Sequence, residues 1–186
     1  MGQWASQQHA AAHCDLSDEQ VEEIRMLTSL PVKEIARIRS KYRAVAQHED
    51  MSKAEFYALP AVAGNPLRDR LFQMLELSSE NAIPFTEFTK LVSTFSFHSS
   101  QDTKLRAAFR VHDFDGDGKL SKDDLRAYMA LVYQKPVDDD TDQASTDAAR
   151  QEVVELVVSR IMEEAASDPK RETLAFEDFV KVHMHL

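Results

Sequence analysis

The stretch HDFDGDGKLSKDDL, which runs from His112 to Leu125, constrains the fold more than any other part of the chain. Counted from Asp113, aspartates stand at positions 1, 3 and 5, and a glycine follows at position 6. Alternating carboxylates followed by a glycine, which permits a sharp turn, gather hard oxygen ligands around one cation. Apolar residues at helical spacing flank the stretch on both sides. The pattern therefore predicts a helix, a metal-binding loop and a second helix rather than a solvated acidic turn.

The loop of residues 113–124 supplies the predicted metal ligands, which are Asp113, Asp115, Asp117, Lys119, Ser121 and Asp124. Lys119 would contribute its backbone carbonyl, and Ser121 its hydroxyl or a bridging water. Position 12 holds Asp124, where a glutamate would bind Ca²⁺ through both carboxylate oxygens. Because aspartate is one methylene shorter, we expect one oxygen or a water-mediated contact, which weakens Ca²⁺ binding and favours octahedral Mg²⁺. The sequence thus predicts one site that takes Ca²⁺ or Mg²⁺.

Helix, loop and helix recur four times along the chain, and no strong strand pattern exceeds a few residues. Ser17 with Gln20 and Ser52 with Glu55 are capping boxes that predict helix starts. Residues 135–147 form an acidic, proline-containing linker, and a long helix follows it, with Val153, Leu156, Val157, Ile161 and Met162 as its apolar residues. We predict an all-α fold in which four such units pair into two lobes.

The four units share a common frame even where the ligands differ. The residues at position 12 are Glu55, Glu87, Asp124 and Asp178, and the apolar residues at position 8 are Met51, Ile83, Leu120 and Leu174. Position 8 predicts a short two-residue β bridge between paired loops. We therefore expect a flexible segment at 1–16, an N-terminal lobe at 17–97 with two degenerate units, and a C-terminal lobe at 98–186 with one intact loop and one degenerate loop.

Three loops lack the full ligand set. The first has Ala44 and Ala46 where acids belong, and the fourth has Pro169 and Arg171 at ligand positions, so neither is expected to bind metal. The second loop, residues 76–87, has the correct length but carries an asparagine in place of the glycine and a proline at position 9. Metal binding by the second loop is left open.

Composition excludes several classes of function. The formal net charge of −10 repels nucleic acid, and no basic stripe is present. No apolar run is long enough to cross a membrane. The single cysteine, Cys14, cannot form an internal disulfide, which fits a reducing compartment such as the cytoplasm. No nucleophile elbow, phosphate-binding loop or metalloprotease motif occurs, so we expect no catalysis.

The first six residues, from Met1 to Ser6, fit the pattern for myristoylation of Gly2 after removal of the initiator methionine. One myristoyl chain gives only marginal membrane binding, so a second signal is normally required. The first basic residue is Arg25, and no polybasic patch supplies that signal. The sequence predicts a cytoplasmic protein with peripheral contact at the cytoplasmic face of a membrane through this lipid.

Four segments carry a resemblance to a known family. They are FYALPAVAGNPLRDRLFQML (residues 56–75), VSTFSF (92–97), KLRAAFRVHDFDGDGKLSKDDL (104–125) and LAFEDFVKV (174–182). With these segments the chain resembles the calcineurin B family of EF-hand proteins in the broad sense, including the calcineurin B homologous proteins and the calcium- and integrin-binding proteins. Calcineurin B itself is expected to bind Ca²⁺ in all four loops, which this chain cannot do, so the subfamily stays open.

The resemblance implies a non-catalytic regulatory protein that holds an amphipathic helix of a larger partner, such as an ion transporter, a receptor tail, a phosphatase or a kinase, in an apolar groove. The residues predicted to line the groove are Phe72, Leu75, Phe88, Leu91, Phe95, Phe109, Met129, Val157, Ile161 and Met184. Two alternatives remain: a Ca²⁺-switched sensor, and a calcineurin B-like regulatory subunit of a protein phosphatase.

Overall fold

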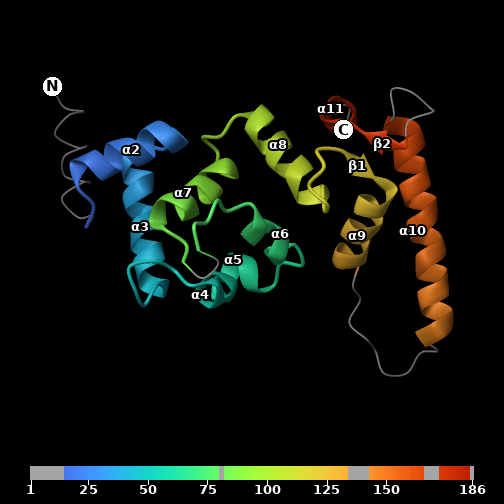
Figure 1. The fold of residues 1–186 in the computed structure, drawn as a ribbon, viewed down its shortest axis with the longest axis horizontal. Helices are drawn as coiled ribbons and strands as arrows, with labels where there is room; N and C mark the ends of the chain where they lie inside the picture. The colour runs from blue at the N-terminus through green and yellow to red at the C-terminus, as the bar shows by residue number, and fades with distance from the viewer. Residues whose placement is uncertain (1–14, 80–81, 134–142, 166–171, 185–186) are drawn as a thin grey trace. The chain divides into compact units, whose positions relative to one another are not determined.

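The computed structural model describes residues 15–79, 82–133, 143–165 and 172–184, with side chains from 148 onward in the third range and up to 182 in the last. Within these ranges the chain is helical apart from its loops and one short sheet (Figure 1). The all-α prediction is therefore confirmed. No helix in the described ranges is both long enough and apolar enough to cross a membrane.

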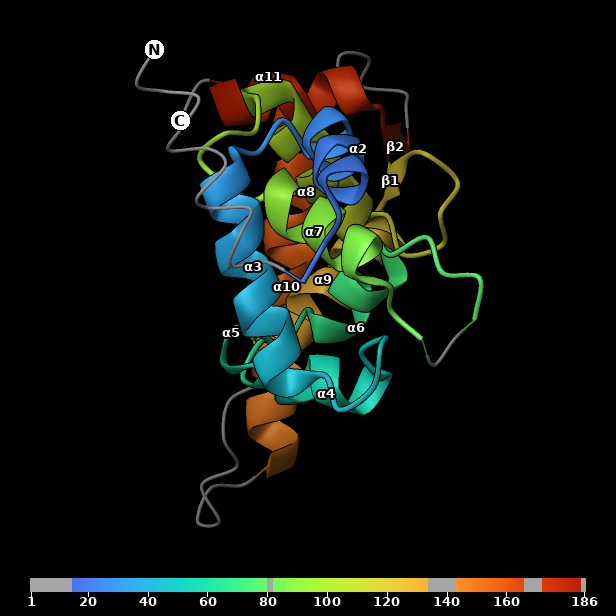
Figure 2. The same cartoon turned by 90° about the vertical axis from the view of Figure 1, so that its left-hand side faces the viewer.

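The first half of the chain contains the helices α2 (Asp18–Thr28), α3 (Val32–Val45), α4 (Lys53–Ala58), α5 (Pro60–Ala63), α6 (Arg68–Gln73) and α7 (Phe85–Thr94). Both predicted capping boxes are present, with Ser17 at the start of α2 and Ser52 at the start of α4. Pro60 ends α4, as predicted, and begins α5. In Figure 2, which faces this half, α2 and α3 are blue and α7 is green, and α2 packs against both α3 and α7.

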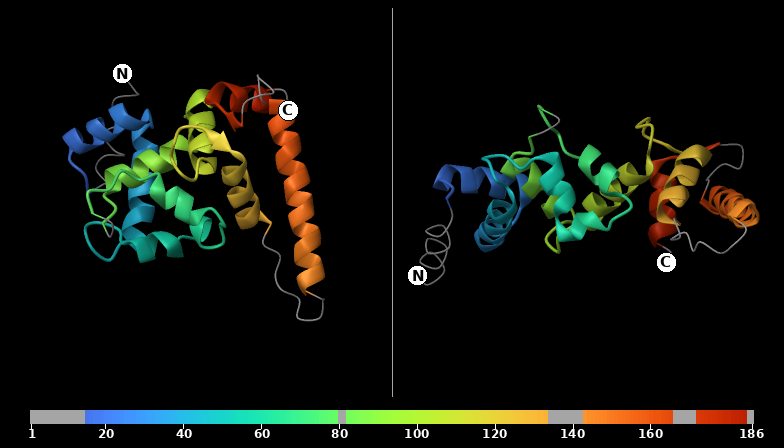
Figure 3. Two further views of the ribbon diagram at one scale, coloured as in Figure 1. Left: turned by 45° about the vertical axis from the view of Figure 1, so that its right-hand side comes forward. Right: turned by 90° about the horizontal axis from the view of Figure 1, so that it is seen from below.

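The second half contains α8 (Gln101–His112), β1 (Leu120–Ser121), α9 (Lys122–Val132), α10 (Gln143–Ala165), β2 (Thr173–Leu174) and α11 (Phe176–Met184). The long helix α10 runs alongside α9 (Figure 3). The predicted linker of residues 135–147 is too long, because α10 already begins at Gln143. The segment QASTD at its end contains neither proline nor glycine, and it precedes two alanines, so it continues the helix backwards.

Residue contacts divide the chain into two compact units, and the division falls inside α8, between Lys104 and Leu105. The four-unit frame read from the sequence places the boundary between the lobes after Phe97. Residues 98–100 form only the turn that precedes α8. The first residues of α8 belong to the first unit, and the rest of the helix belongs to the second. The first unit thus ends at Lys104, and the second begins at Leu105.

Position 8 of each loop pairs as the sequence frame predicted. Met51 and Ile83 form an antiparallel bridge in the first unit, and Leu120 pairs with Leu174 in the second. All four side chains are almost completely buried, with exposed fractions of 2% or less. Burying an aliphatic side chain of this size stabilises a fold by roughly 1.5–3 kcal/mol. The bridges therefore join the loops and also anchor each pair in a hydrophobic core.

Each unit has its own core. In the first, the buried residues include Val21, Ile24, Ile35, Ile38, Tyr42, Met51, Phe56, Ile83, Phe85 and Phe88. In the second, they are Phe109, Leu120, Leu125, Val158, Met162, Ala165, Leu174 and Phe179. The apolar face predicted for α10 is only partly buried. Val153 is 58% exposed and Leu156 is 71% exposed, because α10 turns the predicted Met162 and the unpredicted Val158 towards the core.

Candidate metal centre

The loop of residues 113–124 begins at the end of α8. The backbone N–H of Asp113 donates to Phe109 O, as in a further helical residue. The end of α8 therefore fixes the position of the first acidic residue of the loop. The chain then turns twice at glycines with positive φ, +74° at Gly116 and +81° at Gly118. Residues with a side chain rarely adopt this conformation, which explains why glycine stands at both places.

Backbone amides hold the carboxylates of the loop. The oxygens of Asp113, which is 7% exposed, accept the N–H groups of Gly116 at 2.8 Å and Gly118 at 3.0 Å. Asp115 accepts the N–H of Asp117, and Asp117 accepts that of Lys119. These bonds fold the loop around its own acids, so the carboxylates converge before any cation is added.

The carboxylate oxygens of Asp113, Asp115 and Asp117 lie within 4.8 Å of one another. Ca²⁺ binds oxygen at about 2.3–2.6 Å, so two ligands on opposite sides of one ion stand about 5 Å apart. The spacing of the three aspartates therefore fits a single hard cation. Three negative charges held this close together also repel one another unless a cation is bound, which adds an electrostatic preference for a divalent ion.

Asp124 does not join this group of three. It is 3% exposed, and both of its oxygens accept hydrogen bonds, Oδ1 from the N–H of Phe114 and Oδ2 from the N–H and hydroxyl of Ser121. Burial raises the pKa of the Asp124 carboxyl, but the hydrogen bonds from Ser121 and Phe114 outweigh it and hold the pKa below its ordinary value. Ser121 and Asp124 together form the capping box of α9.

The position-12 carboxylates of the other loops are also engaged. Glu87 accepts the Lys90 ammonium at 2.6 Å, and this bond raises the pKa of Lys90. Asp178 is 2% exposed and accepts the N–H of Ala175. Glu80 and Asn81 of the second loop, and residues 166–171 of the fourth, lie outside the described residues. For the second loop, the lysine on Glu87 competes with any metal for that carboxylate.

An apolar pocket of about 150 Å³ adjoins the metal loop in the second unit. Its lining residues are His112, Leu120, Leu125, Tyr128, Met129, Ile161, Ala165, Leu174, Phe179 and Val182. The rings of His112 and Tyr128 lie 4.1 Å apart. Leu120 and Leu125 belong to the metal loop and to the first turn of α9, so the loop itself builds part of the pocket wall.

Two of the predicted groove residues, Met129 and Ile161, line this pocket. Phe109 is buried in the core of the second unit, and Val157 is half-buried. Leu75 and Phe88 are buried in the core of the first unit, and Phe72 and Leu91 are partly buried and pack against that core. Phe95 is 49% exposed, and the side chain of Met184 lies outside the described residues. Leu125 and Tyr128 also line the pocket but are not among the predicted groove residues, although both share one helical face with Met129 in the sequence.

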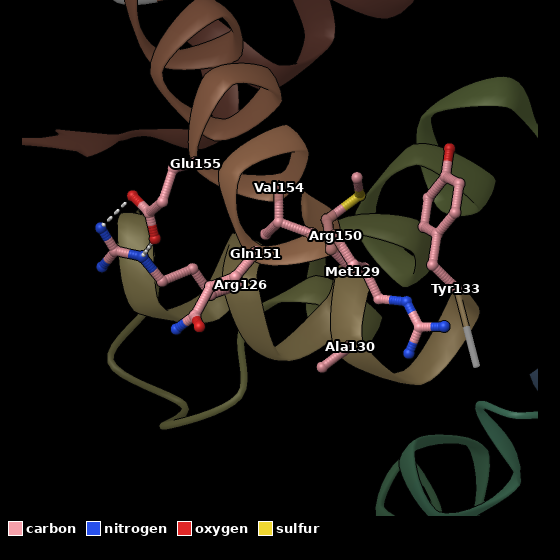
Figure 4. A pocket seen from close by; sticks show the side chains of 8 residues that line it. All are labelled: Arg126, Met129, Ala130, Tyr133, Arg150, Gln151, Val154 and Glu155. Atoms are coloured by element: carbon pink, nitrogen blue, oxygen red, sulfur yellow. Dashed lines mark hydrogen bonds and ion pairs between the residues drawn. The ribbon is translucent and has the colours of Figure 1, made fainter. Parts of the chain in front are cut away.

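A second, more polar cavity of about 320 Å³ lies between α9 and α10 (Figure 4). Arg126 spans its edge and binds Glu155 through two nitrogens, at 2.6 and 2.9 Å. Arg126 also binds Asp123. Tyr133 and Arg150 stand at the other end of the cavity, as Figure 4 shows. The ion pair between Arg126 and Glu155 ties the middle of α9 to α10.

Comparison with known proteins agrees with this architecture. Residues 102–183 match the EF-hand domain pair. The calcineurin B protein of Schizosaccharomyces pombe is 31% identical over 128 residues, which cover 68% of this chain and 74% of the relative. The chain belongs to the calcineurin B-like family of EF-hand proteins.

Other calcineurin B relatives extend the match over more of the chain. The calcineurin B protein of Naegleria gruberi is 27% identical over 172 residues, covering 91% of this chain and 90% of the relative. That of Kluyveromyces lactis is 28% identical over 156 residues, covering 83% and 82%. The family resemblance predicted from the four sequence segments is confirmed. The EF-hand pair coincides with the unit that carries the 113–124 loop and the apolar pocket.

Proposed function

We propose that this calcineurin B-like protein is a non-catalytic regulatory subunit. It binds Ca²⁺ or Mg²⁺ in the 113–124 loop and holds an amphipathic helix of a larger protein in the apolar pocket of its second unit. The observation that carries the proposal is the shared wall between loop and pocket: Leu120 and Leu125 flank the last ligands and also line the cavity. An ion that fixes the loop therefore also fixes the surface that a partner helix would contact.

The ligand set supports a modest cation site. Asp113, Asp115 and Asp117 converge, whereas Asp124 lies outside this group and its Oδ2 accepts both the N–H and the hydroxyl of Ser121. Coordination by both oxygens of Asp124 requires the loss of one of the two bonds that Oδ2 accepts from Ser121, and coordination through water does not. We propose that the ion keeps water at this position, which suits Mg²⁺ at resting ion levels and lowers the affinity for Ca²⁺. Titration calorimetry with both ions tests this, and a sub-micromolar Ca²⁺ affinity that millimolar Mg²⁺ leaves unchanged contradicts it.

A second candidate partner follows from the names of the relatives, which are the B-type subunits of calcineurin. In this second proposal, the amphipathic helix bound in the pocket belongs to the catalytic subunit of a protein phosphatase. The three degenerate loops distinguish this chain from a four-site Ca²⁺ sensor, so we expect the partner to stay bound after Ca²⁺ is removed, provided Mg²⁺ is present. A transporter, receptor or kinase helix is the other outcome of the experiment below.

The experiment is affinity purification of the full chain followed by mass spectrometry, in Ca²⁺, in Mg²⁺ and in chelator. Met129→Gln places a polar group in the apolar pocket, whereas Leu156→Gln changes a residue that is 71% exposed on α10 and serves as the matched control. We expect Met129→Gln to lose the partner and Leu156→Gln to retain it. Equal capture by both variants contradicts the pocket as the binding site, and strictly Ca²⁺-dependent capture favours the sensor alternative.

We also propose that Gly2 is myristoylated and that the lipid gives weak contact with the cytoplasmic face of a membrane. Gly2 lies outside the described residues, and its support is the Met1 to Ser6 sequence alone. Co-expression with an N-myristoyltransferase and intact-mass measurement tests it. The expected mass increase should vanish in Gly2→Ala, and an unmodified wild-type chain contradicts the proposal.

A further inference from the structure

The first loop of the chain is shorter than the metal loop, although both end in the same kind of bridge. Leu120 is the eighth residue after His112, the last residue of α8. Met51 is only the sixth residue after Val45, the last residue of α3. Ala44, which the sequence frame placed at ligand position 1, is therefore helical. The loop lacks the chain length to encircle a cation, in addition to lacking the acids.

A tyrosine hydroxyl occupies the bridge of this first unit. Tyr42 lies three residues before the end of α3, as Phe109 lies three residues before the end of α8. The Tyr42 hydroxyl donates to Ile83 O at 2.7 Å and accepts the Met51 N–H at 2.8 Å. The side chain is completely buried. One phenol thus bonds both strands of the bridge and connects the first loop to the second.

One of the two backbone hydrogen bonds of the bridge is long. Ile83 N–H donates to Met51 O at 2.8 Å, but the reciprocal bond from Met51 N–H to Ile83 O is 3.2 Å long. The Met51 amide is therefore closer to the Tyr42 oxygen than to its bridge partner. The ring of Tyr42 is fixed by edge contact with Phe85, at a centroid distance of 5.2 Å, and by Phe88 at 5.5 Å.

The carboxylate of Glu55 closes the other end of the same loop. Oε1 accepts the N–H of Gln47 at 2.8 Å, and Oε2 accepts both the N–H and the hydroxyl of Ser52 at 2.7 Å. Hydrogen bonds from Ser52 and Gln47 hold the pKa of Glu55 below its ordinary value. The position-12 carboxylate thus closes the first loop by the same hydrogen bonds that Asp124 makes in the second unit.

We infer that the Tyr42 hydroxyl holds the paired loops of the first unit together in place of a metal ion, with Glu55 closing the first loop, so that Ca²⁺ or Mg²⁺ acts on the second unit alone. The second unit closes its metal loop in the same way through Asp124, but it has no counterpart to the Tyr42 hydroxyl, because Phe109 carries no hydroxyl and packs against Phe176 and Phe179. The inference rests on the proposed function for the ion-dependent half. The claim that the bridge of the first unit needs no metal is independent of the proposed function, because it is argued from the hydrogen bonds of Tyr42.

Amide hydrogen exchange of the full chain tests both halves. In the wild type, exchange at Met51 and Ile83 should be the same in chelator, Ca²⁺ and Mg²⁺, whereas exchange at Leu120 and Leu174 should slow when either ion is added. An ion-induced slowing at Met51 and Ile83 comparable to that at Leu120 and Leu174 overturns the inference. If neither ion changes the exchange rates at Leu120 and Leu174, the proposed metal site is contradicted. The exchange rates at Met51 and Ile83 then still test the metal-independent bridge of the first unit.

The Tyr42→Phe variant isolates the hydroxyl, because it keeps the buried ring. We expect exchange at Met51 and Ile83 to rise about fivefold, which corresponds to the loss of one ordinary buried hydrogen bond. Tyr57→Phe is the matched control, since it removes a hydroxyl from the same unit that bonds Asp69 and does not touch the bridge. Equal exchange in the wild type, Tyr42→Phe and Tyr57→Phe contradicts the role of Tyr42.

Discussion

The hydroxyl of Ser121 donates to Asp124 Oδ2 at 2.5 Å, and in return accepts the backbone N–H of Asp124 at 3.1 Å. This reciprocal pair starts α9 and at the same time occupies the last carboxylate of the metal loop. Helix capping and metal coordination therefore compete for the same side chain. The length of the side chain at position 124 should therefore determine how strongly the carboxylate binds the cation.

Lengthening that side chain should strengthen the site. Asp124→Glu adds one methylene, which lets the carboxylate reach the cation with both oxygens while glutamate still serves as a capping-box residue. We expect Ca²⁺ affinity to rise about tenfold or more, and the preference for Mg²⁺ to fall. Titration calorimetry measures both constants. Unchanged affinities for the two ions would mean that residue 124 is not a ligand.

Removing different aspartates of the loop should separate folding from metal binding. Asp113→Ala leaves the amides of Gly116 and Gly118 without their acceptor, so we expect a loss of about 1–3 kcal/mol in the free energy of unfolding even in chelator. Asp117→Ala removes an exposed carboxylate and should cost much less stability. Both variants should lose cation binding. Urea unfolding in chelator and calorimetry with Ca²⁺ distinguish the two effects, and equal stability of the two variants contradicts the structural role of Asp113.

The glycine at position 6 should be essential for the turn. Gly118 has a φ of +81°, so Gly118→Ala should destabilise the loop by about 1–2 kcal/mol and weaken ion binding. Gly64 is the natural control, because its φ is −96° and a Cβ there would meet nothing within 4 Å. Gly64→Ala should be neutral or stabilising by up to about 1 kcal/mol. Thermal unfolding of both variants in Ca²⁺ and in chelator gives the comparison.

Alkaline pH should weaken the first unit through Tyr57. Burial, together with the hydrogen bond to Asp69, raises the pKa of Tyr57 to about 12. A phenol whose pKa is higher in the folded state stabilises the fold fully below its unfolded pKa of about 10, and this contribution is lost as pH rises towards the folded value. Tyr57→Phe should flatten the fall in stability over that range. Urea unfolding at several alkaline pH values, with tyrosinate absorbance as a second readout, tests this, and parallel curves for wild type and variant contradict it.

Much of the fold follows from local sequence chemistry. The capping boxes at Ser17 and Ser52, the helix stop at Pro60 and the pairing of Met51 with Ile83 each depend on a few neighbouring residues and a shared frame. Such signals survive in a single sequence because the physical cause lies within one turn or one loop. The three convergent aspartates of the 113–124 loop belong to the same class.

Other features depend on tertiary neighbours and are not predictable in this way. The apolar residues of α10 cover more than half of its circumference, so packing against α9 and α11 decides that Val158 is buried and Leu156 is exposed. Counting a twelve-residue loop back from Glu55 places its first residue at Ala44. The sequence does not reveal that α3 continues to Val45 and that the loop is therefore shorter. The double role of Asp124 is hidden because serine at position 9 and aspartate at position 12 suit a metal loop and a helix cap equally well.

The shortened first loop limits how this chain could change. In a loop of full length that lacks only its acids, a few point substitutions can restore metal binding. Here aspartates alone would not suffice, because two residues would have to be inserted between Val45 and Met51 and the Tyr42 hydroxyl would have to leave the bridge. Each of these steps taken singly breaks contacts in a buried core before any ion can compensate. We therefore expect that stepwise mutation rarely gives the first unit a chelating loop, whereas the proposed site of the second unit should be adjustable by one methylene at residue 124.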